Sequence, residues 1–238
     1  MPVSKTDFVR GLQCEKMLWL DAHAPQLKII PPEVQARLDA GNEFGDGAMG
    51  IFGTFTEATL FKEDGKLHFS AMLEKTRALL ESGEEVVCEA AFSWYGNYCA
   101  ADILKKEKRG YDLYEVKNTH FAREEFIVDL GFQSLILRKC GVPLLARKLV
   151  LRGDAPPKDC PPSPYENGNV EFLENKNFLY KIVDVTLEAK RAEQLASARI
   201  FELGKLKRKD ASIPQIGVGE HCEKPYRCWY YEYCHGEK

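Results

Sequence analysis

The sequence lacks any apolar run near the roughly 20 residues that cross a membrane, and Met1 to Asp7 lacks the apolar stretch of a secretory signal. It contains no internal repeat and no low-complexity tract. Basic residues are not in excess, since 33 Lys and Arg stand against 36 Asp and Glu for a formal charge of −3. We therefore expect a cytoplasmic protein with no membrane partner, in which a local patch or metal ions would hold any nucleic acid.

Cysteine is the residue type that stands out, with eight copies in 238 residues. The cytoplasm keeps thiols reduced, so we interpret some of these cysteines as metal ligands rather than as disulfide partners. Three lie in one short tail with five residues in each gap: Cys222, Cys228 and Cys234. Cys14, in the first helical pattern, is the best candidate for a fourth ligand. Cys88 and Cys140 fall in apolar patterns and are interpreted as small core residues.

The metal itself stays open at this level. Three thiolates and a distant fourth can hold a 4Fe-4S cluster, or a tetrahedral zinc ion in which His221 or His235 could replace a cysteine. The alternative is a tail without metal that packs its rings as an aromatic plug: Tyr226, Trp229, Tyr230 and Tyr233.

Helical patterns occupy the first third of the chain. A capping box at Ser4 to Asp7 opens a helix that extends to Leu18, and the prolines at 31 and 32 open a second helix. The stripe of that second helix is apolar or small: Val34, Leu38, Gly41, Gly45 and Ala48. A third helix runs through Met72 and Leu80.

The apolar period then changes to two, which predicts a sheet that begins near Glu85. Three short strands (86–94, 98–104 and 111–117) form a meander, with turns at 96–97 and 105–110, and a helix over 123–140 covers it. A strand over 144–152, a proline-rich loop over 155–164, two strands within 170–182 and a helix over 186–209 follow. The pattern predicts a single α/β domain over 1–238: helical 1–82, a core over 83–183, and a long helix with the cysteine tail over 184–238.

Charged residues at the ends of two neighbouring strands need an explanation. Asp102 is the one carboxylate, toward the end of the otherwise apolar strand CAADIL, and Glu115, Val116 and Lys117 end the next strand. Strand parity places Glu115 and Lys117 on one face, roughly 7 Å apart, with Val116 on the other. Two carboxylates on adjacent strands can hold Mg²⁺ or Mn²⁺, and the ammonium can orient a water or balance a phosphate. The alternative is a cross-strand ion pair on a solvated face, worth only ~0–1 kcal/mol.

Two further polar residues bear on this choice. Gln133 lies on the helix stripe with Phe126, Leu130 and Leu137, where a buried amide requires a partner that the strand ends, or the backbone at the helix end, could supply. Glu89 lies opposite the apolar row of its own strand, so it either adds an acidic group to a cleft or faces water.

At this point the sequence resembles a family. Asp102, the Glu115-Val116-Lys117 triplet and Gln133 in the next helix are similar to the motif of the PD-(D/E)XK nucleases. The resemblance is closest to the RecB-type exonuclease branch that includes CRISPR-associated iron-sulfur exonucleases, and it covers nearly the whole chain. That branch pairs one early cysteine with three near the C terminus, which here implies a cluster on four residues: Cys14, Cys222, Cys228 and Cys234.

The resemblance implies a restriction-endonuclease-like core, a mixed central sheet flanked by helices. It also implies Asp102, Glu115 and the Val116 carbonyl as metal ligands, Lys117 beside the attacking water, and Gln133 as a steadying amide. The tyrosine that ends the family motif is replaced by Leu137. The early histidine of RecB-type sites falls at Gly45, with Asp46 beside it as a further candidate ligand, together with Glu89.

The resemblance thus implies a Mg²⁺- or Mn²⁺-dependent DNA exonuclease with a structural 4Fe-4S cluster, acting on single-stranded or end-bearing DNA. Two basic runs offer a phosphate track: Lys105, Lys106, Lys108 and Arg109, and Lys205, Lys207, Arg208 and Lys209. One alternative is a DNA-binding or docking module with little catalysis, within a repair or CRISPR adaptation complex. The other is a zinc-stabilised structural protein whose carboxylates are surface charges.

Overall fold

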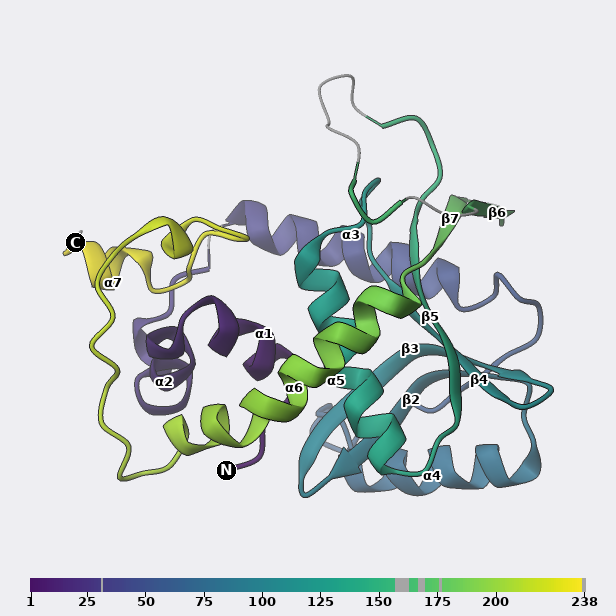
Figure 1. Cartoon of the computed structure of the whole chain (residues 1–238), viewed down its shortest axis with the longest axis horizontal. Helices are drawn as coiled ribbons and strands as arrows, with labels where there is room; N and C mark the ends of the chain where they lie inside the picture. The colour runs from purple at the N-terminus through teal and green to yellow at the C-terminus, as the bar shows by residue number, and fades with distance from the viewer. Residues whose placement is uncertain (31, 157–162, 167–169, 176, 237–238) are drawn as a thin grey trace.

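A seven-stranded mixed sheet forms the centre of the structure, in the order β1-β2-β3-β4-β5-β7-β6 (Figure 1). The structure, a computed structural model, describes all residues except 31, 157–162, 167–169, 176 and 237–238. The strands are β1 (Thr56–Glu57), β2 (Val86–Trp94), β3 (Asn97–Glu107), β4 (Gly110–Val116), β5 (Leu144–Arg152), β6 (Val170–Glu174) and β7 (Leu179–Asp184). The predicted α/β class is confirmed.

Two tight turns and one helical crossover set the order of the strands. Gly96, with φ +78°, lies in the turn between β2 and β3, which pair antiparallel, as do β3 and β4. Strand β3 continues to Glu107, so the second turn is only Lys108–Arg109, shorter than the predicted 105–110. Helix α5 (Glu124–Lys139) then connects β4 to the parallel strand β5. A parallel neighbour requires such a crossover.

Helices cover both faces of the sheet. One face lies under α5 and α6 (Thr186–Leu206), while α3 (Pro32–Ala48) packs on the other and α4 (Phe69–Ser82) packs against β2. At the other end of the molecule, α1 (Lys5–Gln13) and α2 (Glu15–His23) lie beside the tail that carries α7 (Tyr231–His235) (Figure 1). Short 3-10 turns occupy Pro25–Leu27 and Glu220–Cys222.

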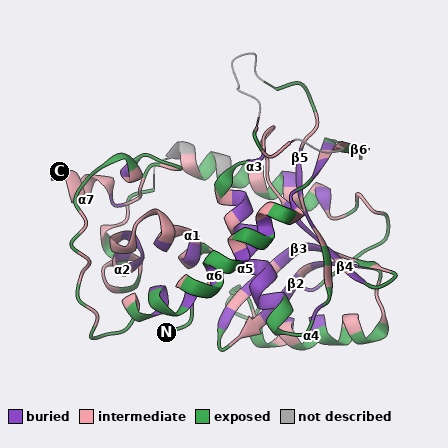
Figure 2. Ribbon diagram, viewed as in Figure 1, coloured by how far each residue is buried: buried purple, intermediate pink, exposed green. Residues whose placement is uncertain are grey.

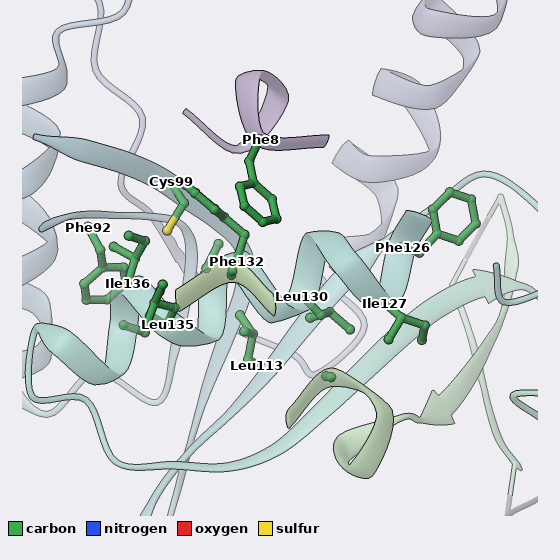
Figure 3. Packing of buried hydrophobic residues seen from close by; sticks show 14 of the residues in the cluster. Phe8, Phe92, Cys99, Leu113, Phe126, Ile127, Leu130, Phe132, Leu135 and Ile136 are labelled. Carbon is green, nitrogen blue, oxygen red and sulfur yellow. The ribbon is translucent and has the colours of Figure 1, made fainter. Parts of the chain in front are cut away.

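Helix α5 is the centre of the core, and almost all of its residues from Phe126 to Leu137 are buried (Figure 2). Figure 3 shows its side chains against the sheet and against Phe8 of α1, whose ring centroid lies 5.0 Å from that of Phe132. Gly131 permits the close approach of α6, since a Cβ there would lie 2.6 Å from Ala192. Because α5 is fixed on all sides, any polar group on it has a defined position.

Strand β2 does not keep one alternation along its length. Val86 and Cys88 pack under α3, whereas Ala90 and Phe92 pack on the opposite face under α5 and α6. The face changes at Glu89, whose φ of +53° lies in the left-handed region. The prediction that Cys88 shares a face with Ala90 and Phe92 is therefore wrong, although Cys88 is buried as expected. A non-glycine residue in this region costs about 1 kcal/mol or more, and such strain clusters at functional sites.

Other differences are local. The first helical pattern is two helices, because Cys14, with an extended backbone, ends α1 and begins α2. Cys140 is exposed at the end of α5 rather than in the core, and its thiol donates to the Ser93 carbonyl oxygen at 3.3 Å. Helix α6 ends at Leu206, before the predicted 209. None of the described helices is both long and apolar enough to cross a membrane.

Candidate functional site

Asp102 lies where β3 pairs with β2 and approaches β4. Register places it opposite Glu89, since Cys88 pairs with Ile103 and Ala90 with Ala101. Its Oδ2 accepts a hydrogen bond from the Val116 N–H at 2.7 Å. This contact ties the carboxylate of β3 to the end of β4. Because β3 runs on to Glu107, Asp102 lies in the middle of its strand and not at the predicted end, opposite the strained backbone of Glu89.

Glu115 is buried, with 1% of its side chain exposed, and its carboxylate is bonded by Lys5, Lys117 and Gln133. The Lys117 ammonium lies 2.6 Å from its Oε1, and the Gln133 Nε2 donates to its Oε2 at 2.5 Å. Glu115 and Lys117 thus share one face of the sheet, as strand parity predicts. Gln133 is fully buried, and its Oε1 has no hydrogen-bond partner among the described residues. The structure therefore brings together Asp102, Glu115, Lys117 and Gln133.

Two residues that the sequence analysis missed complete this group, namely Lys5 and Asp129. The Lys5 Nζ lies 3.0 Å and 3.2 Å from the two carboxylate oxygens of Glu115, and 3.7 Å from Asp102 Oδ1. Asp129 Oδ2 accepts a hydrogen bond from Lys117 Nζ at 2.8 Å, and the Asp129 Oδ1 has no partner in the part of the chain that the structure describes. The carboxylate group, as we call it, comprises Glu89, Asp102, Glu115, Asp129, Lys5 and Lys117.

Both missed residues left a signal in the sequence. Asp129 lies four positions before Gln133 on α5, and residues four apart share a helix face. A charge on that buried stripe requires a partner, as the Gln133 amide does. Lys5 is the first residue of α1, where the positive end of the helix dipole disfavours a cation. An ammonium at that position implies a strong acidic partner elsewhere in the fold.

Charge is unbalanced within the carboxylate group, because four carboxylates face two ammonium groups. Burial, and then the negative charge of Glu115, raise the pKa of Asp102 to about 6. Burial and Asp102 likewise raise the pKa of Glu89 to about 7. Burial opposes ionisation of Glu115, but Lys117 and Lys5 outweigh it and hold its pKa well below the usual range. The group therefore carries up to two negative charges without a counter-charge, which favours the binding of a cation.

These side chains lie in a cleft of about 650 Å³ between the sheet, α1, α3 and the tail. Glu89 and Asp46 both line it, although no contact joins the exposed Asp46 to the carboxylate group. Four residues of the predicted stripe of α3 also line the cleft: Val34, Leu38, Gly41 and Gly45. The last residue of that stripe, Ala48, is instead buried in the core. Cations and rings line the remaining walls: Arg10, Arg123, Arg227, Tyr226 and Trp229.

The two basic runs of the sequence lie outside this cleft. None of their eight residues is among those that line it. Lys105 pairs with Glu107, and Lys207 bonds Asp7 at 2.6 Å, so both cations serve local ion pairs. The lining of the cleft therefore gives no support to a phosphate track on these runs, which stays a prediction. The cleft takes its positive charge from Lys5, Lys117 and three guanidinium groups, which are scattered in the sequence.

A second cavity gathers the cysteines of the tail and the early cysteine. It is lined by Cys14, Cys222, Cys228 and Cys234, together with His221, Met17 and Tyr230. The Cys222 Sγ lies 3.7 Å from His221 Nε2, and the Tyr230 N–H points at the Cys228 Sγ at 3.4 Å. Burial raises the pKa of the Cys228 thiol to about 11, and the neighbouring thiols add to this rise.

The choice of Cys14 as the companion of the tail cysteines therefore agrees with the geometry. His235 stacks on Tyr231 and does not line the cavity, unlike His221. Two tail rings, Tyr226 and Trp229, line the cleft instead of the cysteines, so the aromatic plug is divided between two sites. Cys160 lies outside the described residues.

No set of three or more His, Cys, Asp or Glu side chains in the described ranges is arranged as a metal-binding group. In the carboxylate group, the Lys5 ammonium lies against the oxygens of Glu115 and near Asp102. The donors nevertheless suit a hard divalent ion, because they are all oxygens, carry excess negative charge, and include one buried oxygen, Asp129 Oδ1, without a partner among the described residues. The four thiols suit either an iron-sulfur cluster or zinc.

Neither a scan against models of protein families nor a search of curated proteins finds a match to this chain.

Proposed function

We propose that this chain is a Mg²⁺- or Mn²⁺-dependent deoxyribonuclease of the PD-(D/E)XK class, of the RecB exonuclease type. The observation that carries the proposal is the convergence of two strand-borne carboxylates on one point. The same Lys5 ammonium lies 3.0 Å from Glu115 and 3.7 Å from Asp102. Two carboxylates that share one small cation can equally share a divalent ion.

The sheet supports the same proposal. An antiparallel meander of β2, β3 and β4, followed by α5 and the parallel strand β5, is compatible with the restriction-endonuclease-like core that the motif implies. In that fold the motif residues would lie on two adjacent strands and the following helix, and here Asp102 lies in the middle of β3, Glu115 near the end of β4 and Gln133 on α5.

The roles follow from the contacts. Asp102, Glu115 and the Val116 carbonyl would hold the ion, which would polarise the phosphate and lower the pKa of a bound water. The Val116 N–H holds Asp102 in place, and Gln133 fixes one oxygen of Glu115. The Lys117 ammonium, held by Asp129 at 2.8 Å, would face the charge that develops on the phosphate.

The lining of the cleft favours a nucleic-acid strand as substrate. Arg10 bonds Asp21 at 2.7 Å, but Arg123 and Arg227 have looser ion pairs, at 3.8 and 3.5 Å, and can turn to phosphates. Tyr226 and Trp229 can offer ring faces to unpaired bases. The Arg10 guanidinium already lies 3.9 Å from the centre of the Trp229 ring. We therefore propose single-stranded or end-bearing DNA as the substrate, with binding that weakens as salt rises.

The four cysteines would hold a 4Fe-4S cluster that fastens the tail to the N-terminal helices. The contacts around them already join these segments, since the Gln13 Nε2 donates to the carbonyl oxygens of His221 and Tyr226 at 2.8 and 2.7 Å. Zinc is the alternative occupant. Iron and a brown colour in an anaerobic preparation would support the cluster, and stoichiometric zinc in a colourless protein would exclude it.

The test of the proposed activity is cleavage of end-labelled single-stranded DNA with Mn²⁺. Asp102→Ala and Lys117→Ala should each lower the rate by about 100-fold or more with the fold retained. Lys148→Ala is the matched control. Its side chain is 22% exposed against 25% for Lys117, and it bonds Asp112 at 2.8 Å outside the cleft. Undiminished cleavage in both site variants would overturn the proposal.

One observation favours a second candidate, a DNA-binding module without turnover. The carboxylates are held by lysines, and no metal-binding arrangement is formed in the described part of the chain. Such a module would dock DNA ends within a repair or CRISPR adaptation assembly. Binding of DNA ends with no cleavage under any divalent ion would select this candidate over the enzyme.

A further inference from the structure

The Lys5 ammonium lies among three carboxylates of the carboxylate group, in the place that a bound metal ion would take. Its Nζ lies within 3.2 Å of both oxygens of Glu115, 3.7 Å from Asp102 and 3.9 Å from Asp129. Three carboxylates from β3, β4 and α5 thus surround one ammonium that comes from a separate element, α1. No other cation in the described residues contacts all three.

The backbone that carries Lys5 is fixed. The Ser4 N–H donates to Asp7 at 2.9 Å and the Asp7 N–H donates to the Ser4 hydroxyl at 3.1 Å, which closes a capping box around the lysine. Just before it, Val3 is buried and donates its N–H to the Asn97 side chain at 2.8 Å. The segment therefore holds the Cα of Lys5 in place, and only the flexible four-carbon side chain can move.

Lys117 differs from Lys5 in what holds it. It bonds Asp129 at 2.8 Å as well as Glu115, so it keeps a carboxylate partner if Glu115 turns to another ligand. Lys5 has hydrogen bonds to Glu115 alone, and its other carboxylates lie at 3.7 Å and beyond. Its side chain is 24% exposed and lines the cleft, so a path into the cleft is open to it.

We propose that Lys5 is a built-in counter-ion that competes with the divalent ion for Glu115 and Asp102. This inference rests on the proposed function, because it assigns regulation of the same site. Without the ion, Lys5 neutralises buried carboxylates that would otherwise repel one another. When a divalent ion binds, the Lys5 ammonium leaves Glu115 and turns into the cleft, where a phosphate can accept its hydrogen bonds. Lys5 thus moves between the carboxylates and the phosphate, whereas Lys117 keeps its bond to Asp129.

Replacing the Lys5 ammonium by a divalent ion improves the balance of charge at the carboxylate group. The group places four carboxylates against two ammonium groups, and replacing one ammonium at Glu115 by a divalent ion adds positive charge there while the lysine remains nearby for the substrate. A permanent structural ion pair, in contrast, would keep its geometry whether or not an ion is present. The two cases differ in how the affinity for the ion responds to the side chain at position 5.

The experiment measures Mn²⁺ binding to the full chain by electron paramagnetic resonance, without DNA. Lys5→Met removes the competitor and should tighten the Kd for Mn²⁺ by about 10-fold or more, the equivalent of one charge-assisted hydrogen bond. Lys5→Arg should weaken it by a similar factor, because a guanidinium holds a carboxylate with two parallel hydrogen bonds. Lys190→Met, at an exposed lysine on α6, is the control and should match the wild type.

Thermal melting supplies a second measurement. Lys5→Met should melt below the wild type without Mn²⁺, because it leaves buried carboxylates unbalanced, and should show the larger rise in Tm on addition of Mn²⁺. If Lys5→Met does not fold without Mn²⁺, the Lys5→Arg variant still tests the predicted loss of affinity. A purely structural lysine would lower the Tm without changing the Mn²⁺-induced shift.

The outcomes separate the two proposals. Glu115→Gln should abolish the Mn²⁺ binding seen in the wild type. If it does, but Kd in Lys5→Met and Lys5→Arg stays within about twofold of wild type, the role of Lys5 is refuted and the proposed function stands. If Glu115→Gln binds Mn²⁺ as the wild type does, the ion lies elsewhere and the proposed function fails. If neither the wild type nor any variant binds Mn²⁺, the proposed function and the role of Lys5 both fail.

Discussion

Replacing Gln133 by leucine should separate function from stability. The amide is fully buried, donates to Glu115 Oε2 at 2.5 Å, and leaves its own Oε1 without a partner among the described residues. Loss of a hydrogen bond to a charged group costs about 1.5–3 kcal/mol, whereas removing an unpaired buried oxygen returns about 1–3 kcal/mol. Leucine is close in size, so the cavity left behind is small. The free energy of unfolding should therefore change by only about 1 kcal/mol.

The activity should change much more. Gln133 orients a carboxylate that would bind the metal, and such partners are worth about 10- to 100-fold in metal affinity or activity. Urea unfolding and a Mn²⁺-dependent nuclease assay on the same preparation measure both quantities. Ser134→Ala is the matched control, because Ser134 is the adjacent buried polar residue and accepts from Arg147 Nε at 3.2 Å, away from the site.

The control should show the opposite balance. Ser134→Ala leaves a buried guanidinium N–H without its acceptor, so it should lose about 1–3 kcal/mol of stability and keep its activity. The reasoning would be refuted if Gln133→Leu lost more than about 2 kcal/mol while its folded fraction cleaved DNA at the wild-type rate. Gln133 would then be a structural amide.

Three further outcomes are expected. Cys228→Ala should lose iron and melt at a lower temperature than the wild type. The control is Cys99→Ala, which should keep its iron because Cys99 is buried in the core outside the cavity. Equal iron content in the two variants would exclude the tail as a cluster site. Trp229→Ala should weaken binding of single-stranded DNA by about 1–3 kcal/mol in a fluorescence anisotropy titration, and unchanged affinity would exclude base stacking at that ring. Asp7→Asn should lower the free energy of unfolding by about 1 kcal/mol at pH 7, because hydrogen bonds from Lys207 and Ser4 overcome burial and lower the pKa of Asp7. Since that pKa is lower in the folded state, the difference is present above about pH 4 and should vanish as the pH falls further; a difference that persists at pH 2 would contradict the role of the charge.

Local patterns in the sequence predicted most of the elements. Strand β5 is Leu144–Arg152 as predicted, and α5 begins one residue after the predicted Arg123, which is its N-cap. These assignments rest on hydrophobic period and on glycine or proline at the boundaries, which are local properties of the chain. The face of Cys88 could not be predicted this way, because the left-handed φ of Glu89 interrupts the alternation and Glu89 is not a residue type that marks such a backbone.

The sequence predicted some residues of the candidate site and missed others. Asp102, Glu115, Lys117 and Gln133 stand out because a charge or an amide interrupts an apolar pattern. Lys5 comes from a helix 97 positions before Asp102, and only the tertiary fold brings it within 3.7 Å. The same holds for the cleft arginines, since isolated cations give no pattern, whereas the continuous basic runs proved to lie elsewhere.

The most direct test of the account is a crystal of the chain soaked in Mn²⁺, with the anomalous signal of the metal measured. The account predicts a peak within coordination distance of both Asp102 and Glu115, with the Lys5 ammonium displaced from Glu115 toward the cleft. A well-occupied Mn²⁺ peak elsewhere, with Lys5 still bonded to Glu115, would contradict it.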